Sequence, residues 1–81
     1  MKIYRIFHNE PAGYDTYDSA VVIAESEQEA VMIHPDGDGD WDGKIKSYDS
    51  WVPANKVKCE YLGEAKEGSK RGVVVASFNA G

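Results

Sequence analysis

The chain has 81 residues, a net charge of −5 and a single cysteine. This length allows one domain, residues 1–81, with a small core to which two Trp, five Tyr and two Phe contribute. One cysteine excludes an internal disulfide, and no apolar run reaches the roughly 18 residues that span a membrane. The N-terminus lacks the apolar region of a signal peptide, so we expect a soluble cytoplasmic protein that does not contact membranes.

The first part of the chain predicts two strands. Residues 2–8 are rich in β-branched and aromatic side chains, and Pro and Gly follow them. Residues 19–24 have no polar face, so we expect a central strand that is covered on both sides. The intervening residues 14–18 fit either a loop or the beginning of this second strand.

A short helix is predicted next. Ser26 and Glu29 form a capping box, in which each side chain bonds the amide of the other residue. The helix continues to Ile33 and stops before Pro35, because the residue that precedes a proline avoids helical geometry. At about two turns, such a helix is held by packing, with Ala30 and Ile33 toward the sheet.

Residues 36–55 form a long connection rich in Gly, Asp and Ser, with aromatic side chains at Trp41, Tyr48 and Trp51. Long loops inside small domains are usually functional or have structure of their own. We expect these aromatic side chains to pack on the sheet face that the helix leaves open. The alternative is a homodimer that buries this face.

Two more strands are predicted near the C-terminus. Residues 56–62 alternate between polar and apolar, which places Val57, Cys59 and Tyr61 inward. Residues 72–78 are apolar on both faces. The order β-β-α-β-β predicts an α+β fold, a small antiparallel sheet of about four strands with one short helix and a long acidic loop.

Charge divides the chain into two parts. Residues 6–43 hold ten acidic and no basic side chains, whereas the remainder holds nine basic and four acidic ones. Acidic residues gathered on one face would attract basic protein surfaces and oppose direct binding of nucleic acid. The alternative is that the two parts interleave in the fold and pair their charges.

Catalysis is not predicted. Two His and one Cys are too few for a zinc site, and Cys59 falls on the inward side of a strand. The chain has neither a Gly-x-Ser-x-Gly elbow nor a glycine-rich phosphate loop, and no cofactor is expected.

The sequence PDGDGDWDG at 35–43 has two interpretations. From Asp38 it matches part of an EF-hand calcium loop, whose ligands would be Asp38, Asp40, Asp42 and Asp49, with Gly43 at the sharp turn. The last ligand is Asp instead of Glu, two lysines lie in the loop, and no helix is expected after it. A solvated acidic turn and an acidic surface for a protein partner are the other interpretations.

Most of the chain outside this loop resembles small uncharacterised proteins of tailed bacteriophages and prophages. The similar segments are YDSAVVIAESEQEA at 17–30, IHP at 33–35, YLGEA at 61–65 and GVVVASFNAG at 72–81. This resemblance implies a phage accessory protein in the host bacterial cytoplasm. It supplies no activity and no catalytic or binding residue.

Together, charge and resemblance lead to one hypothesis and one alternative. The hypothesis is a non-enzymatic protein that binds a basic surface of a host protein, as an anti-defence inhibitor of the anti-CRISPR or DNA-mimic kind. The alternative is a small calcium-binding module. The residues assigned to partner binding are Asp36, Asp38, Asp40 and Asp42, supported by Asp15, Asp18 and Glu10.

Overall fold

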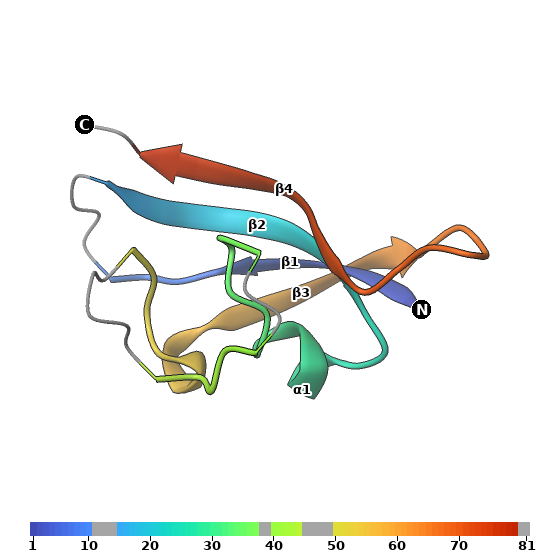
Figure 1. Ribbon diagram of the computed structural model, residues 1–81, viewed down its shortest axis with the longest axis horizontal. Helices are drawn as coiled ribbons and strands as arrows, with labels where there is room; N and C mark the ends of the chain where they lie inside the picture. Colours follow the sequence, from blue (N-terminus) through green and yellow to red (C-terminus); the bar gives the residue numbers. More distant parts are fainter. Residues whose placement is uncertain (11–14, 38–39, 45–49, 80–81) are drawn as a thin grey trace.

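A computed structural model describes residues 1–10, 15–37, 40–44 and 50–79. Four strands form one antiparallel sheet in the order β3-β1-β2-β4 (Figure 1). This arrangement confirms the predicted small α+β fold and its β-β-α-β-β order. The described part of the chain contains no helix that is long and apolar enough to cross a membrane. The elements are β1 (Lys2–Phe7), β2 (Thr16–Ala24), α1 (Glu27–Ala30), the 3-10 helix η1 (Ala54–Lys56), β3 (Lys58–Glu64) and β4 (Gly72–Asn79).

β1 and β2 lie in the middle of the sheet, and their registers define its two faces. Tyr4 lies opposite Val22 and Ile6 lies opposite Ala20, and all four side chains are buried. Ala24 continues the same row and is also buried. Because neighbouring strand residues point to opposite faces, these five residues form one apolar face, called here the covered face.

The helix begins as predicted but ends early. The Glu29 amide donates to Ser26 Oγ over 3.2 Å, whereas the Glu29 carboxylate accepts from the Glu25 amide instead of the Ser26 amide. α1 stops at Ala30, three residues before the predicted end at Ile33. The amides of Met32 and Ile33 bond carbonyls three residues back, as in a tightened last turn, because β-branched side chains and the approaching proline oppose a further α-turn.

The connection between α1 and β3 packs on the same face as the helix, which corrects the expectation for residues 36–55. Trp41 and Trp51 are buried in one cluster with Ala30 and Ile33 and with the covered face of the sheet. Tyr48 lies outside the described residues. One short helix alone would leave most of the covered face exposed, and the indoles of Trp41 and Trp51 supply the additional apolar area that buries it.

The opposite face, called here the open face, has no such layer from the described residues, so the expected cover on both sides of β2 is seen on one side of the described part. It carries Arg5, Phe7, Val21 and Val75, which neighbour one another across the strands. The guanidinium of Arg5 lies 4.2 Å from the Phe7 ring centroid and 3.8 Å from the Glu60 carboxylate. A long charged side chain thus shields part of this apolar surface.

β2 and β3 differ from their predictions in detail. β2 begins at Thr16, so residues 16–18 belong to the strand. In β3, Cys59 contacts the core as expected, but Tyr61 is 51% exposed, although its ring meets Tyr4 edge-on at 5.9 Å. The edge position of β3 explains this, because no described strand lies beyond β3 to enclose the ring.

Candidate functional site

A row of aromatic rings connects the strands to the connecting segment. His34, buried at 2% exposure, packs edge-on between Tyr17 of β2 at 6.3 Å and Trp41 at 5.2 Å. Phe78 of β4 extends the row and meets Tyr17 at 4.8 Å. Edge-to-face contacts of this kind add about 0.5–1.5 kcal/mol each beyond area burial, so they fix where the connecting segment lies.

His34 also fixes Asp36. The Asp36 amide lies 3.1 Å and its carboxylate 3.0 Å from His34 Nδ1. A neutral ring accepts from the amide through Nδ1, whereas a protonated ring donates to the carboxylate from the same atom. In either state the buried ring holds Asp36 at the surface, where its side chain is 36% exposed.

His8 has a similar role beside Trp51, as His34 has beside Trp41. Its Nε2 lies 3.2 Å from the Tyr17 carbonyl, and its Nδ1 accepts from the Glu10 amide over 3.1 Å. The ring meets Trp51 edge-on at 5.2 Å, and the Tyr17 amide donates to the Ser50 carbonyl. Both histidines therefore join the sheet to the connecting segment. The sequence offered no signal for this, because the contacts are between residues far apart in the chain.

Residues 41–44 form a closed turn. The Trp41 indole Nε1 donates to the Lys44 carbonyl over 2.7 Å, and the Lys44 amide donates to Asp42 Oδ1 over 2.9 Å. Gly43 has φ +84°, and a Cβ there would lie 3.1 Å from both Ala54 and Met32. Glycine is therefore required at this position by backbone angle and by close approach.

Three of the predicted partner-binding residues are in contact with, or next in the chain to, the His34–Trp41 ring pair. Asp36 contacts His34, and Asp40 and Asp42 flank Trp41 in the chain. All three are exposed. We call Asp36, Asp40 and Asp42 the loop carboxylates. Asp38, which belongs to the same predicted set, lies outside the described residues.

The other three predicted residues lie elsewhere at this end of the sheet. Asp15 and Asp18 are exposed at the beginning of β2, and Asp18 Oδ2 accepts from Ser77 Oγ over 3.4 Å. Glu10 forms an ion pair with Lys56 at 2.7 Å, and Lys56 lowers the pKa of this carboxyl, through a hydrogen bond first and its charge second.

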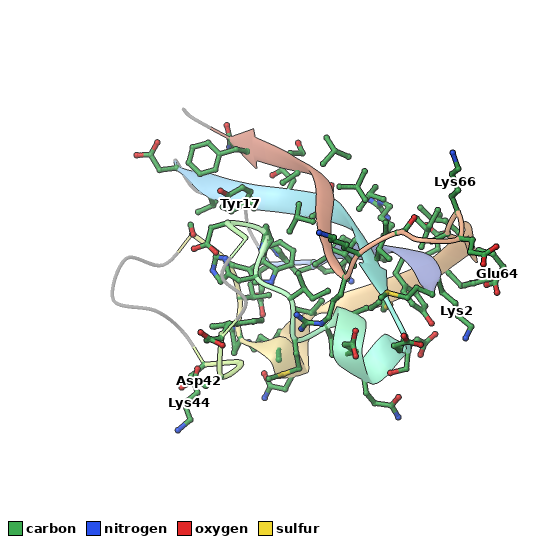
Figure 2. The ribbon with its side chains drawn as sticks, turned by 45° about the vertical axis from the view of Figure 1, so that its right-hand side comes forward. Lys2, Tyr17, Asp42, Lys44, Glu64 and Lys66 are labelled. Carbon is green, nitrogen blue, oxygen red and sulfur yellow. The ribbon has the colours of Figure 1, made fainter. Side chains whose placement is uncertain are left out.

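The acidic and basic parts of the sequence interleave in part. Besides Glu10 with Lys56, the Glu29 carboxylate lies 3.0 Å from Arg71 Nε. This follows from the topology, because β4 from the basic part pairs with β2 from the acidic part. Figure 2 shows Asp42 and Lys44 at one end of the molecule and Lys2, Glu64 and Lys66 at the other.

The calcium hypothesis concerns the same turn. Asp38 and Asp49, its first and last ligands, lie outside the described residues, whereas Asp40 and Asp42 are exposed. Within the described ranges, no group of three or more His, Cys, Asp or Glu is close enough to hold a metal ion. The Lys44 carbonyl, which would be the backbone ligand at the seventh loop position, accepts the indole hydrogen bond instead.

Cys59 is the strongest nucleophile by residue type. Burial, with a smaller effect of the Glu27 carboxylate, raises the pKa of its thiol to about 11. The thiol is therefore protonated at neutral pH, whereas a reactive cysteine needs a lowered pKa.

Searches for similarity found no family model, curated protein or solved structure that matches the chain. The functional argument therefore depends on the site itself.

Proposed function

We propose that this is a non-enzymatic protein that binds a basic surface of another protein through the loop carboxylates. The observation that supports this is their position: exposed Asp36 contacts buried His34, and exposed Asp40 and Asp42 are the chain neighbours of buried Trp41, which packs on the same ring. A carboxylate on a fixed support loses little conformational entropy when it meets an Arg or Lys.

The partner that fits this surface is a protein whose own ligand is an anion, such as a nucleic-acid-handling or defence complex of a bacterial host. Carboxylates would there occupy positions that DNA phosphates normally take. The phage context comes from the sequence resemblance, and the charge comes from the site. Asp15 and Asp18, at the neighbouring end of β2, would extend the acidic surface.

The test is capture of a partner from bacterial lysate, followed by affinity measurement with two matched variants. One variant changes Asp36, Asp40 and Asp42 to Asn. The control changes three exposed glutamates elsewhere to Gln, so that the net charge is equal: Glu25, Glu27 and Glu67.

We expect the Asn variant to bind the captured protein at least about tenfold more weakly, since charge-assisted hydrogen bonds contribute about 1.5–3 kcal/mol each. The Gln control should bind within about twofold of wild type. Added salt should weaken wild-type binding, because screening acts over about 8–10 Å. Equal capture by the Asn variant would contradict the proposal, and circular dichroism would confirm that the variants fold.

Calcium binding is the second proposal, and Gly43 is the observation that favours it. Its positive φ of 84° supplies the sharp turn required at the sixth position of a calcium loop. Titration calorimetry with calcium, beside a magnesium control, tests it directly. If millimolar calcium produces no binding heat and no shift in melting temperature, the calcium proposal is wrong.

A further inference from the structure

β4 is an edge strand without a charged side chain. It runs for eight residues, GVVVASFN, and in the described part of the chain it pairs with β2 alone (Figure 1). Val74 and Val75 are each 58% exposed. Proteins usually protect an edge strand with lysine, proline, a short length or a covering element, because its outer amides and carbonyls can pair with another strand. β4 has one bulge, at Val74, which is also a form of edge protection, but the described residues supply none of the other four.

β3, the opposite edge, is protected. It carries Lys58, Glu60 and Glu64, and α1 packs against it. Charged side chains along a strand make the approach of a second strand unfavourable. The two edges of one sheet therefore differ, and only β4 is suited to pair with another strand.

The open face is a poorer contact surface than this edge. A partner packed on it would bury the ion pair of Arg5 and Glu60, whose side chains are 44% and 58% exposed. Removing two charges from water costs several kcal/mol per ion unless new partners compensate. Pairing along β4 leaves both side chains in solvent.

We propose that two copies of this chain associate through β4. A two-fold axis perpendicular to the sheet pairs the two strands antiparallel and makes one continuous sheet of eight strands. In this arrangement a residue on the axis lies opposite its own copy. The middle of β4 is Val75 and Ala76, so Val75 of one copy lies directly opposite or diagonally beside Val75 of the other.

Charge favours this geometry over other contacts between copies. At −5 per chain, two copies repel each other at most orientations. The antiparallel pair brings the end of β4 that follows Lys70 and Arg71 toward the far end of the other copy, where Asp15 and Asp18 begin the neighbouring strand. At each end of the uncharged strand, opposite charges then lie about two strand spacings apart, roughly 10 Å, because β2 is separated from the second copy by β4. The loop carboxylates take no part, so the inference does not rest on the proposed function.

The size of the interface predicts its strength. Eight residues give an edge about 27 Å long, at about 3.4 Å per residue. One strand edge of this length buries less than the roughly 1,200 Å² that marks the lower limit of stable interfaces. We therefore expect a concentration-dependent dimer with a dissociation constant in the micromolar to millimolar range.

Sedimentation equilibrium from about 10 µM to about 1 mM, which spans this range, tests the proposal with the full chain. Val75→Lys places two positive charges close together across the axis and should raise the dissociation constant about tenfold or more. Leu62→Lys is the matched control: it adds the same charge at an exposed aliphatic residue, 51% exposed, on the other edge strand. We expect the control to dimerise within about threefold of wild type.

A mixture supplies the sharper test. Val75→Glu alone should also be monomeric, whereas an equimolar mixture of Val75→Lys and Val75→Glu should form a heterodimer. A wild-type chain that stays monomeric at about 1 mM would overturn the proposal. The proposal would also be overturned if Leu62→Lys and Val75→Lys lost the dimer equally, or if the mixture of Val75→Lys and Val75→Glu stayed monomeric. Both substitutions are at exposed positions, and thermal unfolding will show whether the variants are folded.

Discussion

The two faces of the sheet are both apolar in sequence, yet only one holds a core. On the covered face, Ile6 and Val22 are fully enclosed beneath α1 and the indoles of Trp41 and Trp51. On the open face, Arg5 lies over Phe7 and approaches Glu60. The difference teaches that apolar strand residues do not by themselves define a core. What matters is which face the aromatic side chains of the connecting segment reach.

The largest expected effect concerns Trp41. Trp41→Ala should lower the free energy of unfolding by about 3–5 kcal/mol, because it removes a large buried ring and its bond to the Lys44 carbonyl. Phe7→Ala on the open face should cost only about 1 kcal/mol, since that ring is half-buried. Urea unfolding measures both. Equal losses would mean that the indole is not part of the core, and Trp41→Phe provides a folded variant if Trp41→Ala does not fold.

Two neighbouring valines give the closest comparison of the faces. Val22 is fully buried on the covered face, whereas Val21 is half-buried on the open one. Val22→Ala should cost about 2–3 kcal/mol, since it removes two methyl groups and leaves a cavity. Val21→Ala should cost less than about 1 kcal/mol. Because the residue change and the strand are the same, the difference between the two losses measures the effect of burial beneath the covering layer. A larger loss for Val21→Ala would reverse the assignment of the faces.

The smallest effect is a pH dependence from Cys59, which contacts the covered face. Its thiol has a pKa of about 11 in the folded chain against an ordinary value of 9.0. Below pH 9 the thiol is neutral in both states and stability does not depend on it. Between pH 9 and 11 the unfolded chain loses the proton first, so stability falls as pH rises.

Cys59→Ala removes this contribution. The stability difference between wild type and Cys59→Ala should therefore change between pH 9 and 11 and stay constant between pH 6 and 8, where the thiol is protonated in both states. The difference is the useful quantity, because burial also raises the pKa of Tyr4 and a hydrogen bond to Glu64 raises that of Tyr61. Chemical unfolding at several pH values measures it. A constant difference up to pH 11 would contradict the burial of the thiol.

Local features of the chain were predictable where the residue types of a short segment strongly favour one backbone structure. The Ser26 cap is an example, since its Oγ accepts from the Glu29 amide as predicted. The strands were predictable from β-branched and aromatic content, and their positions hold within two residues at most ends. The helix end was predicted three residues too late, because the β-branched Val31 and Ile33 and the approaching proline tighten the last turn.

The candidate site shows the same division. Its exposed aspartates were visible in the sequence, and Asp36, Asp40 and Asp42 are at the surface of the described chain. Their support by His34 was not visible, since the ring meets Tyr17 and Trp41 through contacts that no local pattern encodes.

By itself, the sequence determined the four strands, the helix start and the residues that bear the acidic charge. These depend on backbone preference and on the residue types of short segments. Only the tertiary structure decided which face the connecting segment covers, how acidic and basic residues interleave, and which edge strand is unprotected. The physical reason is that residues 20–24 of β2 are apolar on both sides, so their pattern is the same for either face. The path from α1 to β3, held by His34 between two rings, selects one of them.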